Sequence, residues 1–432
     1  MPRALVVGGS LGGLFAANLL HRAGWEVSVF ERAEAGLSGR GAGIVTHPEL
    51  VSALARAGVD PRTALGVEVS GRIVLDVDGA TLCEVAHRQI LTSWGRLHRL
   101  LMDALPPSSY RNGVTIQAID ERARSVAVIG VEGRKAIEHE ADLVVAADGI
   151  RSTLRAQLLS DAKPAVQPEY AGYVAWRGLV DEPSLSAATR ALLFERFGFC
   201  LPEGEQMLGY PVAGAGDSVR PGERRYNFVW YRPADARAAL PDLLTDASGR
   251  LHAANISPQA IRTDVVAAMR RDAEAVLAPQ FAEIVRCTAQ PFLQPIYDLM
   301  SPRLAFARVA LLGDAAFVAR PHVGMGVTKA AEDAVALVDA LAGAGAGGNV
   351  DVPAALRAYD AVRRPIGAAV VERARHLGAY MQAQVRSAEE RAMAVRYRTP
   401  QAVMCQTALS VVAADALEAT ELRHRQDAGC AI

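Results

Sequence analysis

Three side chains in this sequence are placed where a proton acceptor could act on a bound molecule. His47 follows a glycine-rich run and precedes Pro48, Tyr210 lies in the sequence G-Y-P, and His322 follows Pro321. Imidazole titrates near neutral pH, and a base within hydrogen-bond reach of the proton that it removes contributes about 10²–10⁴ in rate. Each also has an ordinary structural interpretation: a helix cap, a half-buried sheet tyrosine and a loop hydrogen bond. We keep all three as candidate catalytic residues.

The loop that contains His322 belongs to a segment suited to a flat ligand. An apolar run from Val309 to Leu312 stops at Gly313 and Asp314, and a loop rich in Pro and Gly leads into an Ala-rich segment of helical period. Asp314 can accept hydrogen bonds from sugar-alcohol hydroxyls. Glycines let bare backbone approach a flat ligand, and a helix start favours negative charge. The loop residues assigned to this contact are Pro321, Gly324, Met325 and Gly326.

The N-terminus has the pattern of a dinucleotide-binding βαβ unit. A short apolar run, residues 4–7, is followed by a glycine-rich loop, a helix-period segment over residues 14–23 and a second apolar run that ends at Glu31. This order predicts a pyrophosphate at the helix N-terminus and a ribose hydroxyl on the carboxylate. Ser10 stands where the usual pattern has its middle glycine, and its hydroxyl could donate to a phosphate. The loop residues assigned to this site are Gly8, Ser10, Leu11 and Gly13.

Two further motifs could contribute to such a site. Arg40 lies in the glycine-rich run of residues 39–44 and could face a phosphate or a nicotinamide cofactor. Asp148 and Gly149 directly follow an apolar run, residues 143–146, and precede a segment of helical period. A later run, residues 343–348, fits the dinucleotide motif letter by letter but follows a helical segment, so we interpret it as an interhelical loop. Only one dinucleotide-binding fold is therefore expected.

A length of 432 residues indicates two or three domains. Because 51% of the residues are hydrophobic, we expect a folded globular protein. The net charge of -1 gives no electrostatic reason to expect nucleic acid or an anionic membrane as partner. Five scattered cysteines without a C-x-x-C pair indicate a reducing compartment, no structural zinc and no dithiol redox centre. The N-terminus lacks a signal-peptide layout and no apolar run reaches the ~18 residues of a membrane span. We expect a cytoplasmic protein without a metal site.

The residue pattern changes along the chain, and these changes predict its domain organisation. From about residue 164, aromatic residues alternate at period 2 between Gly and Pro, as in an antiparallel sheet, and beyond Asp351 the chain has the pattern of long helices. We predict an α/β fold, α+β overall, with a Rossmann-like βαβ domain, an inserted antiparallel-sheet substrate domain and C-terminal helices. The predicted division is residues 1–164 and 301–385 for the dinucleotide-binding domain, 165–300 for the substrate domain and 386–432 for a helical tail.

These motifs, taken in order, carry a family resemblance. With residues 8–13, Glu31-Arg32, Asp148-Gly149 and Gly313-Asp314 followed by residues 321–326, the chain resembles the FAD-dependent aromatic hydroxylases of the p-hydroxybenzoate hydroxylase type, the group A flavin monooxygenases. The likeness extends to about residue 380. A narrower likeness to the 2,6-dihydroxypyridine 3-hydroxylase branch, which acts on hydroxylated N-heteroaromatic rings, lies in G-A-G-I-V-T-H-P-E-L, Y-A-G-Y-V-A-W-R-G, G-Y-P-V-A-G, Y-N-F-V-W-Y and R-P-H-V-G-M-G.

The resemblance implies a role for each motif. Asp148 and Gly149 would order both the flavin pyrophosphate and the nicotinamide cofactor. Arg96, in W-G-R, would replace an arginine that many relatives carry just before this helix. The implied FAD contacts are Ser10, Gly13, Glu31 and Arg32 for the adenosine-diphosphate half, Asp314 for the ribityl chain, and Gly324 to Gly326 for the flavin ring.

The resemblance also implies the reaction. The protein would hydroxylate a small hydroxylated aromatic or N-heteroaromatic ring, such as a dihydroxypyridine, through a flavin C4a-hydroperoxide formed with NAD(P)H and O2. Because only one dinucleotide-binding fold is expected, NAD(P)H would visit a surface cleft briefly and leave. The partners would be the ring substrate and O2, and a homodimer is one assembly that this allows.

Other functions remain open at this stage. A urate-type hydroxylase would differ only in the size of its pocket, which the sequence does not show. A flavin-dependent disulfide reductase is disfavoured by the missing C-x-x-C pair. From a different class, the chain could be a catalytically silent flavin-binding sensor whose C-terminal helices form a partner surface.

Overall fold

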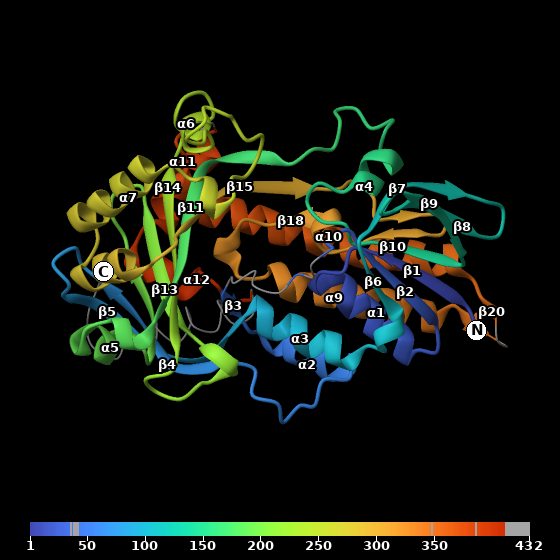
Figure 1. The fold of residues 1–432 in the computed structure, drawn as a ribbon, viewed down its shortest axis with the longest axis horizontal. Coiled ribbons are helices and arrows are strands. Elements are labelled where there is room, and N and C mark those ends of the chain that lie inside the picture. The colour runs from blue at the N-terminus through green and yellow to red at the C-terminus, as the bar shows by residue number, and fades with distance from the viewer. Residues whose placement is uncertain (35–36, 38–42, 347–348, 385–386, 411–432) are drawn as a thin grey trace.

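The computed structural model describes residues 1–34, 37, 43–346, 349–384 and 387–410. Its two largest sheets lie toward opposite ends of the long axis of the molecule, and helices α9 (Gly326–Gly343) and α10 (Val352–Leu377) run between them (Figure 1). The site must therefore be assembled from elements of both halves.

The first sheet is the dinucleotide-binding sheet that the N-terminal pattern predicts. Five of its described strands run parallel and only the edge strand β16 runs antiparallel to its neighbour. Its central strands are buried on both faces, which explains their continuous apolar sequences. In order across the sheet, the strands are β16 (Ala305–Phe306), β17 (Val309–Leu311), β10 (Leu143–Ala146), β1 (Arg3–Val7), β2 (Glu26–Glu31) and β6 (Tyr110–Asn112).

Helix α1 (Leu11–Arg22) begins directly after the glycine-rich loop and packs between this sheet and α9. Leu14, Phe15 and Leu20 are fully buried there, and the small residues Ala331 and Ala334 of α9 join the same core. Small side chains let two helices approach closely, so the Ala-rich sequence of α9 serves packing. The start of α9 is thereby fixed beside the start of α1.

The second sheet has nine strands and forms the other half of the molecule. Trp176 and Trp230 are paired on neighbouring strands and are both buried. The aromatic residues that alternate at period 2 in the sequence therefore lie on the buried face of this sheet. The strands, in order, are β18 (Phe317–Val318), β15 (Phe292–Met300), β11 (Glu169–Asp181), β14 (Arg225–Pro233), β13 (Gln206–Val212), β12 (Arg196–Cys200), β4 (Val67–Leu75), β5 (Thr81–Ser93) and β3 (Gly43–Val45).

Three strands of this large sheet come from an early part of the chain. Strands β3, β4 and β5 lie within residues 43–93, and β4 pairs in parallel with β12. Residues that the sequence assigns to the first part of the dinucleotide-binding domain thus complete the sheet of the substrate domain. The division into domains stays a prediction, whereas the mixed α/β fold with a βαβ unit and an antiparallel sheet is confirmed.

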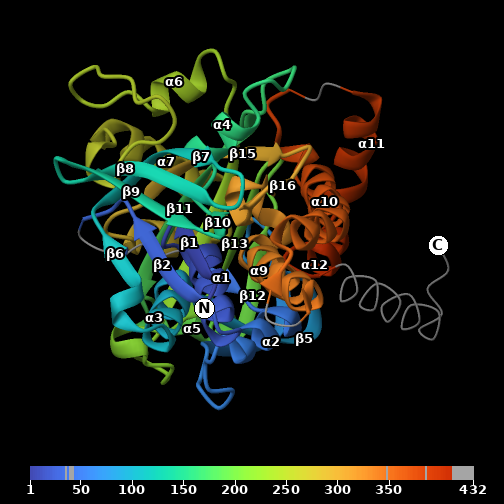
Figure 2. The same ribbon diagram turned by 90° about the vertical axis from the view of Figure 1, so that its right-hand side faces the viewer.

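The remaining elements surround these sheets. Helices α10, α11 and α12 lie along one flank of the molecule (Figure 2), and no described helix is long and apolar enough to cross a membrane. The other helices are α2 (Pro48–Arg56), α3 (Trp94–Ala104), α4 (Thr153–Leu158), α5 (Ala187–Leu193), α6 (Ala239–Leu243), α7 (Thr263–Val276), α8 (Pro279–Cys287), α11 (Ala388–Tyr397) and α12 (Pro400–Gln406), with 3₁₀ turns at Pro107–Ser109, Glu182–Ser184, Ala215–Asp217, Pro258–Ala260, Gly313–Ala315, Pro321–Val323 and Ala379–Met381. The remaining strands are β7 (Val114–Glu121), β8 (Val126–Glu132) and β9 (Lys135–Ala141), which form a separate small sheet, and the pair β19 (Gly345–Ala346) and β20 (Asn349–Val350).

Candidate active site

Two adjoining cavities lie where the two halves of the molecule meet. The larger has a volume of about 1090 Å³ and is lined by the first βαβ unit and by residues 147–156. The smaller, of about 350 Å³, is lined by the large sheet, the start of α9 and the loop before it. They share the lining residues Ser10, Ala147, Gly149, Gln294 and Asp314, so they form one continuous hollow.

The glycine-rich loop at one end of this hollow has no room for side chains at two positions. Gly8 has φ +108°, and a Cβ atom there would lie 2.2 Å from the carbonyl oxygen of Ala147. A Cβ atom on Gly13 would lie 1.9 Å from the carbonyl oxygen of Gly8. The tight turn and the close helix–strand packing that the motif predicts are therefore both present.

Ser10 and Glu31 bring polar groups to the same loop. Ser10 is the N-cap residue of α1, but its hydroxyl makes no capping hydrogen bond, and it lines both cavities. The Glu31 carboxylate accepts hydrogen bonds from the backbone N–H groups of Gly9 (2.9 Å) and Ala33 (2.9 Å), and each of its oxygens can accept another. With Arg32 also in the cavity wall, this end offers a helix N-terminus, a hydroxyl and a fixed carboxylate to a dinucleotide.

Asp314 lies where the two cavities join, on a turn held by a buried charge network. The backbone N–H of Gly313 donates to Asp333 (3.2 Å), and the Lys329 ammonium donates to the carbonyl of Gly313 (3.2 Å). Asp333 in turn pairs with Arg363 at 2.8 Å. Because Lys329, Asp333 and Arg363 are all buried, the turn is rigid and the Asp314 side chain is directed into the hollow. Asp314 is exposed to the hollow, but the protein around it removes part of the water from its carboxyl and raises its pKa, which the positive charge of Lys329 opposes.

A buried arginine joins this turn to the Asp-Gly motif. The Arg155 guanidinium donates to the carbonyl oxygens of Ala315 (3.1 Å) and Ile150 (2.7 Å) and is 2% exposed. Asp148 accepts a hydrogen bond from the backbone of Leu154 at the start of α4, and Asp148 and Gly149 both line the larger cavity. Arg155 thus fixes the spacing between motifs that are about 165 residues apart, a role that the sequence alone did not indicate.

The loop before α9 requires glycine for a reason that its sequence does not reveal. Gly324 has φ +67°, and a Cβ atom there would lie 2.7 Å from Cα of Ala408. The N–H of Ala408 also donates to the carbonyl of His322 at 2.7 Å. Gly326 has no atom within 4 Å of such a Cβ, so its backbone is open to a ligand. In this loop, Pro321, Gly324 and Gly326 line the small cavity, whereas Met325 is buried at the start of α9.

A segment near the C-terminus forms part of the same wall. Thr407 and Ala408 line the small cavity. Fully buried Arg72, on β4, donates to the carbonyl oxygens of Met404 (2.8 Å), Thr407 (2.7 Å) and Ala408 (3.3 Å) and to Gln89 (2.8 Å). We call residues 404–408 the C-terminal wall segment. Nothing in the sequence pointed to it, because its anchor lies more than 330 residues away.

Tyr210 is the candidate catalytic residue that faces the small cavity. It lines this cavity, and no described residue forms a hydrogen bond with its hydroxyl. Burial raises its pKa to about 12, and the positive charge of Arg177 opposes this. Tyr210 therefore keeps its proton near neutral pH and can donate a hydrogen bond to a bound molecule.

The two candidate histidines lie behind the cavity wall. Nδ1 of His47 lies 2.9 Å from the hydroxyl of Thr328, and Nε2 of His322 lies 2.7 Å from the hydroxyl of Tyr173. Neither histidine lines either of these two cavities. Burial lowers the pKa of His47 to about 4 and that of His322 to about 3, so both rings are neutral at pH 7. Their role as bases stays a prediction that this placement does not support.

The buried histidine at 322 should make the stability of the protein depend on pH. Below the ordinary histidine pKa of 6.5, the unfolded chain takes up a proton that the folded chain, with its His322 pKa near 3, does not. The free energy of unfolding should therefore fall on acidification, and His322 alone should account for about 1 kcal/mol of the loss between pH 7 and 5.5. Urea unfolding at both pH values should show a smaller loss in a His322→Gln variant. An equal loss in both proteins would contradict this assignment.

Of the predicted cofactor residues that the structure describes, Gly13, Arg96 and Met325 line neither cavity. Arg40 lies outside the described residues. Arg96 donates to Asp217 (2.7 Å) and to the carbonyl of Ala64 (3.0 Å) and lines neither cavity. Its implied role toward the cofactor therefore gains no support from its position.

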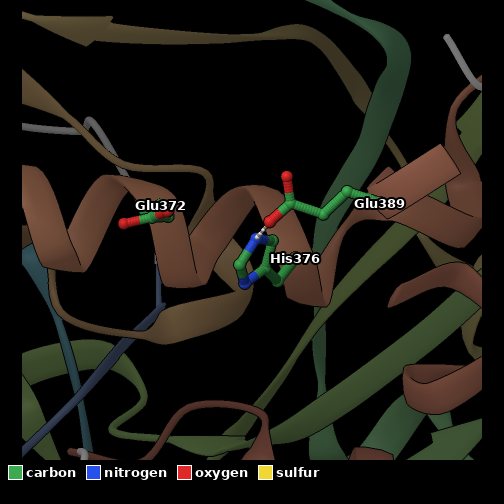
Figure 3. A group of neighbouring side chains, drawn as sticks. All are labelled: Glu372, His376 and Glu389. Atoms are coloured by element: carbon green, nitrogen blue, oxygen red, sulfur yellow. Dashed lines mark ion pairs between the residues drawn. The ribbon is translucent and has the colours of Figure 1, made fainter. Parts of the chain in front are cut away.

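Three potential metal ligands meet elsewhere, between α10 and α11. The ligand atoms of Glu372, His376 and Glu389 lie within 4.8 Å of one another. Glu389 reaches from α11 to His376, at 3.3 Å, while Glu372 lies beside it on α10 (Figure 3). Both glutamates are exposed. An ion pair between two neighbouring helices explains this group, and we assign no metal to it.

The hollow as a whole fits an elongated cofactor with a phosphate-bearing end and a flat end. Gly8 and Ser10 line the larger cavity at the N-terminus of α1, and the Ser10 hydroxyl makes no capping hydrogen bond there. Asp314 stands midway with its carboxylate in the hollow, and Gly326 presents open backbone at the far end. These groups, in this order along the hollow, match the diphosphate, the polyhydroxy chain and the ring of FAD.

Comparison with known proteins decides the assignment. A family model described as FAD binding domain matches residues 2–187, and one described as FAD binding domain-like matches residues 170–298. The chain is 31% identical to 2,6-dihydroxypyridine 3-monooxygenase of Paenarthrobacter nicotinovorans over 342 residues, which cover 78% of this chain and 82% of that protein. The chain belongs to the FAD-dependent aromatic monooxygenases of the p-hydroxybenzoate hydroxylase type.

Further relatives of this monooxygenase support the same family assignment. It is 32% identical to 3-amino-4-hydroxybenzoate 2-monooxygenase of Streptomyces cremeus, over 87% of this chain and 86% of that protein. The solved structure of 2,6-dihydroxypyridine-3-hydroxylase from Arthrobacter nicotinovorans superposes with a TM-score of 0.80 at 27% identity, covering 88% of this chain and 93% of that one. The predicted family, enzyme class and FAD are thus confirmed, and a catalytically silent sensor is disfavoured.

Proposed function

We propose that this monooxygenase hydroxylates a small hydroxylated aromatic or N-heteroaromatic ring, of the dihydroxypyridine kind, with NAD(P)H as the reductant. The observation that carries the proposal is the small cavity, which adjoins the flavin-ring loop and has a mainly apolar wall with few polar groups. Phe197, Leu208 and Val229 line it with buried apolar side chains. An apolar pocket beside the flavin-ring loop suits a small ring. The scattered cysteines further support work in the cytoplasm.

The residues of this chain divide into those that hold FAD and those that hold the ring. Once bound, FAD supplies the oxygen activation, with electrons from NAD(P)H. The chain orients the ring and controls its protons. The residues proposed to hold FAD are Gly8, Ser10, Leu11, Gly13, Glu31 and Arg32 at the diphosphate end, Asp148, Gly149, Gly313 and Asp314 in the middle, and Pro321, Gly324, Met325 and Gly326 at the ring end. All of them line the two cavities except Gly13 and Met325, which belong to the same loops.

Tyr210 is proposed to orient the substrate through its hydroxyl. A ring oxygen that accepts the Tyr210 proton in a hydrogen bond is held in one position, and its negative charge is stabilised. The role of Tyr210 as a base stays a prediction; burial raises its pKa to about 12, which favours the donor form at neutral pH and supports this proposal.

A Tyr210→Phe variant should bind FAD normally but couple NAD(P)H oxidation to hydroxylation poorly. Loss of a hydrogen bond to a charged oxygen costs about 1.5–3 kcal/mol, so the yield of product per NAD(P)H should fall by roughly 10-fold or more. Product and hydrogen peroxide should be measured together. Tyr226→Phe is the matched control, because Tyr226 is fully buried in the same sheet and lines neither cavity. Equal coupling in Tyr210→Phe and the wild type would remove Tyr210 from substrate orientation.

The function itself is tested with purified protein reconstituted with FAD. NADH and NADPH oxidation should be followed with a panel of hydroxypyridines, hydroxybenzoates and urate, and the products identified by mass. Stimulation together with a product one oxygen heavier for a single-ring compound supports the proposal. Such a product from urate alone would favour the fused-ring alternative, and oxidation that no ring compound stimulates would argue against both.

A further inference from the structure

The roles assigned so far leave the hydroxyl of Thr407 without a function. Thr407 is buried and lines the small cavity. Its backbone N–H donates to the carbonyl of Val403 at 3.0 Å, and its carbonyl accepts from Arg72 at 2.7 Å. No described residue forms a hydrogen bond with its hydroxyl. The hydroxyl is therefore the polar group of this residue that is left for a bound molecule.

Contacts of the next residue hold Thr407 in place. The N–H of Ala408 donates to the carbonyl of His322 (2.7 Å), and its carbonyl accepts from Gln89 on β5 (3.2 Å). Ala408 has φ +56°, a left-handed backbone that is unfavourable for a residue with a Cβ atom. Such backbone persists only where the surrounding structure imposes it. The Thr407 side chain therefore extends from a fixed backbone, and a hydrogen bond to its hydroxyl costs little ordering.

The small cavity has few other side chains that can accept a hydrogen bond from a ring. Outside its tyrosines, three further residues of its described lining have an acceptor oxygen. Ser10 and Asp314 are assigned to FAD. The side-chain oxygen of Gln294 accepts from Arg177 at 2.8 Å. The Thr407 hydroxyl is therefore an acceptor that neither FAD nor another side chain occupies.

We propose that the Thr407 hydroxyl accepts a hydrogen bond from an N–H or O–H group of the ring substrate, in addition to the ring oxygen that Tyr210 orients. The enzyme then favours rings that carry such a donor, because an analogue without it leaves a buried hydroxyl unpaired. The proposal rests on the proposed function, since it concerns the substrate of the same cavity. It adds a specificity-determining residue from the C-terminal wall segment, and it narrows the proposed class to rings with both an acceptor oxygen and a donor.

The proposal is tested by binding, without turnover. Holoenzyme is titrated calorimetrically, in the absence of NAD(P)H, with two matched pairs of probes: 4-aminophenol against 4-methylphenol, and 2-pyridone against N-methyl-2-pyridone. The wild type should prefer the donor member of at least one pair. Thr407→Val, which keeps the shape of the side chain without its hydroxyl, should lower this preference by about 5-fold or more, as expected for one lost hydrogen bond. Thr407→Ser, which keeps the hydroxyl, should retain the preference.

Thr288→Val is the matched control variant. Thr288 is also buried, its hydroxyl donates to the carbonyl of Ile284 at 2.8 Å, and it lines neither cavity. Its preference for the donor probes should equal that of the wild type. Melting temperatures of both Thr407 variants show whether any loss reflects unfolding.

The outcomes separate the two sources of the donor. A preference lost for 4-aminophenol alone assigns Thr407 to a substituent of the ring, and one lost for 2-pyridone alone assigns it to an N–H of the ring itself. An equal preference in Thr407→Val and the wild type, or no preference in the wild type, would overturn the proposal, while FAD content and hydroxylated product would still support the proposed function. Holoenzyme that binds none of the four probes would argue against the proposed function as well.

Discussion

A Gly13→Ala variant should purify without FAD. The added Cβ atom would lie 1.9 Å from the carbonyl oxygen of Gly8, a distance that neither backbone can accommodate without moving. Relief requires α1 to shift away from β1, which costs about 1–3 kcal/mol by overpacking and displaces the helix N-terminus from the phosphate position. Because that N-terminus and the Ser10 hydroxyl act only at short range, we expect FAD affinity to fall by about 100-fold or more.

The flavin absorbance per protein after gel filtration measures this effect. Gly343→Ala is the matched control, because Gly343 ends α9 and a Cβ atom added there would have no atom within 4 Å. The control should retain FAD like the wild type. Gly13→Ala protein that carries a full complement of FAD would show that the loop tolerates the shift and that the cofactor is held elsewhere.

Replacing Arg72 by Met should both destabilise the protein and open the small cavity. The carbonyls of Met404 and Thr407 would lose their buried donor, at about 1–3 kcal/mol for each group left unsatisfied, whereas that of Ala408 would keep a hydrogen bond from Gln89 (3.2 Å). We expect the free energy of unfolding to fall by about 3 kcal/mol or more. The C-terminal wall segment should then detach, so water should enter the cavity and product per NAD(P)H should fall.

Chemical unfolding, coupling yield and limited proteolysis near the C-terminus measure the three parts of this prediction. Arg88→Met is the control: Arg88 lies on β5 of the same sheet, its side chain is 80% exposed, and it pairs only with Glu68 on the surface. Such pairs contribute at most about 1 kcal/mol. If Arg72→Met unfolds like the Arg88 variant, the segment is held by its apolar contacts and not by the guanidinium.

Much of the cofactor site could be predicted from the sequence because its signals are local. The turn at Gly8, the close packing at Gly13 and the carboxylate of Glu31 lie within one βαβ unit, where the spacing along the chain fixes the spacing in space. The turn at Gly313 and Asp314 follows a strand of the same sheet and has the same advantage. Period-2 aromatics likewise predicted the antiparallel sheet.

The rest of the site depends on contacts that no local pattern encodes. Arg155 links two distant motifs, and Arg72 anchors a segment more than 330 residues away. Only the structure shows that Arg177 lines the small cavity. For the two histidines, the local sequence suggested a role in the site that their contacts in the structure do not support. His47 and His322 have suitable neighbours in the chain, but partners from other elements, Thr328 and Tyr173, orient their rings behind the wall.

The contact between Gly324 and Ala408 means that a stretch far from every recognised motif takes part in shaping what the enzyme accepts. Exchanging those few positions between related hydroxylases would alter one side of the reaction chamber while leaving the nucleotide-binding half untouched. Fusions and truncations at this end of the polypeptide therefore need as much care as changes beside the flavin.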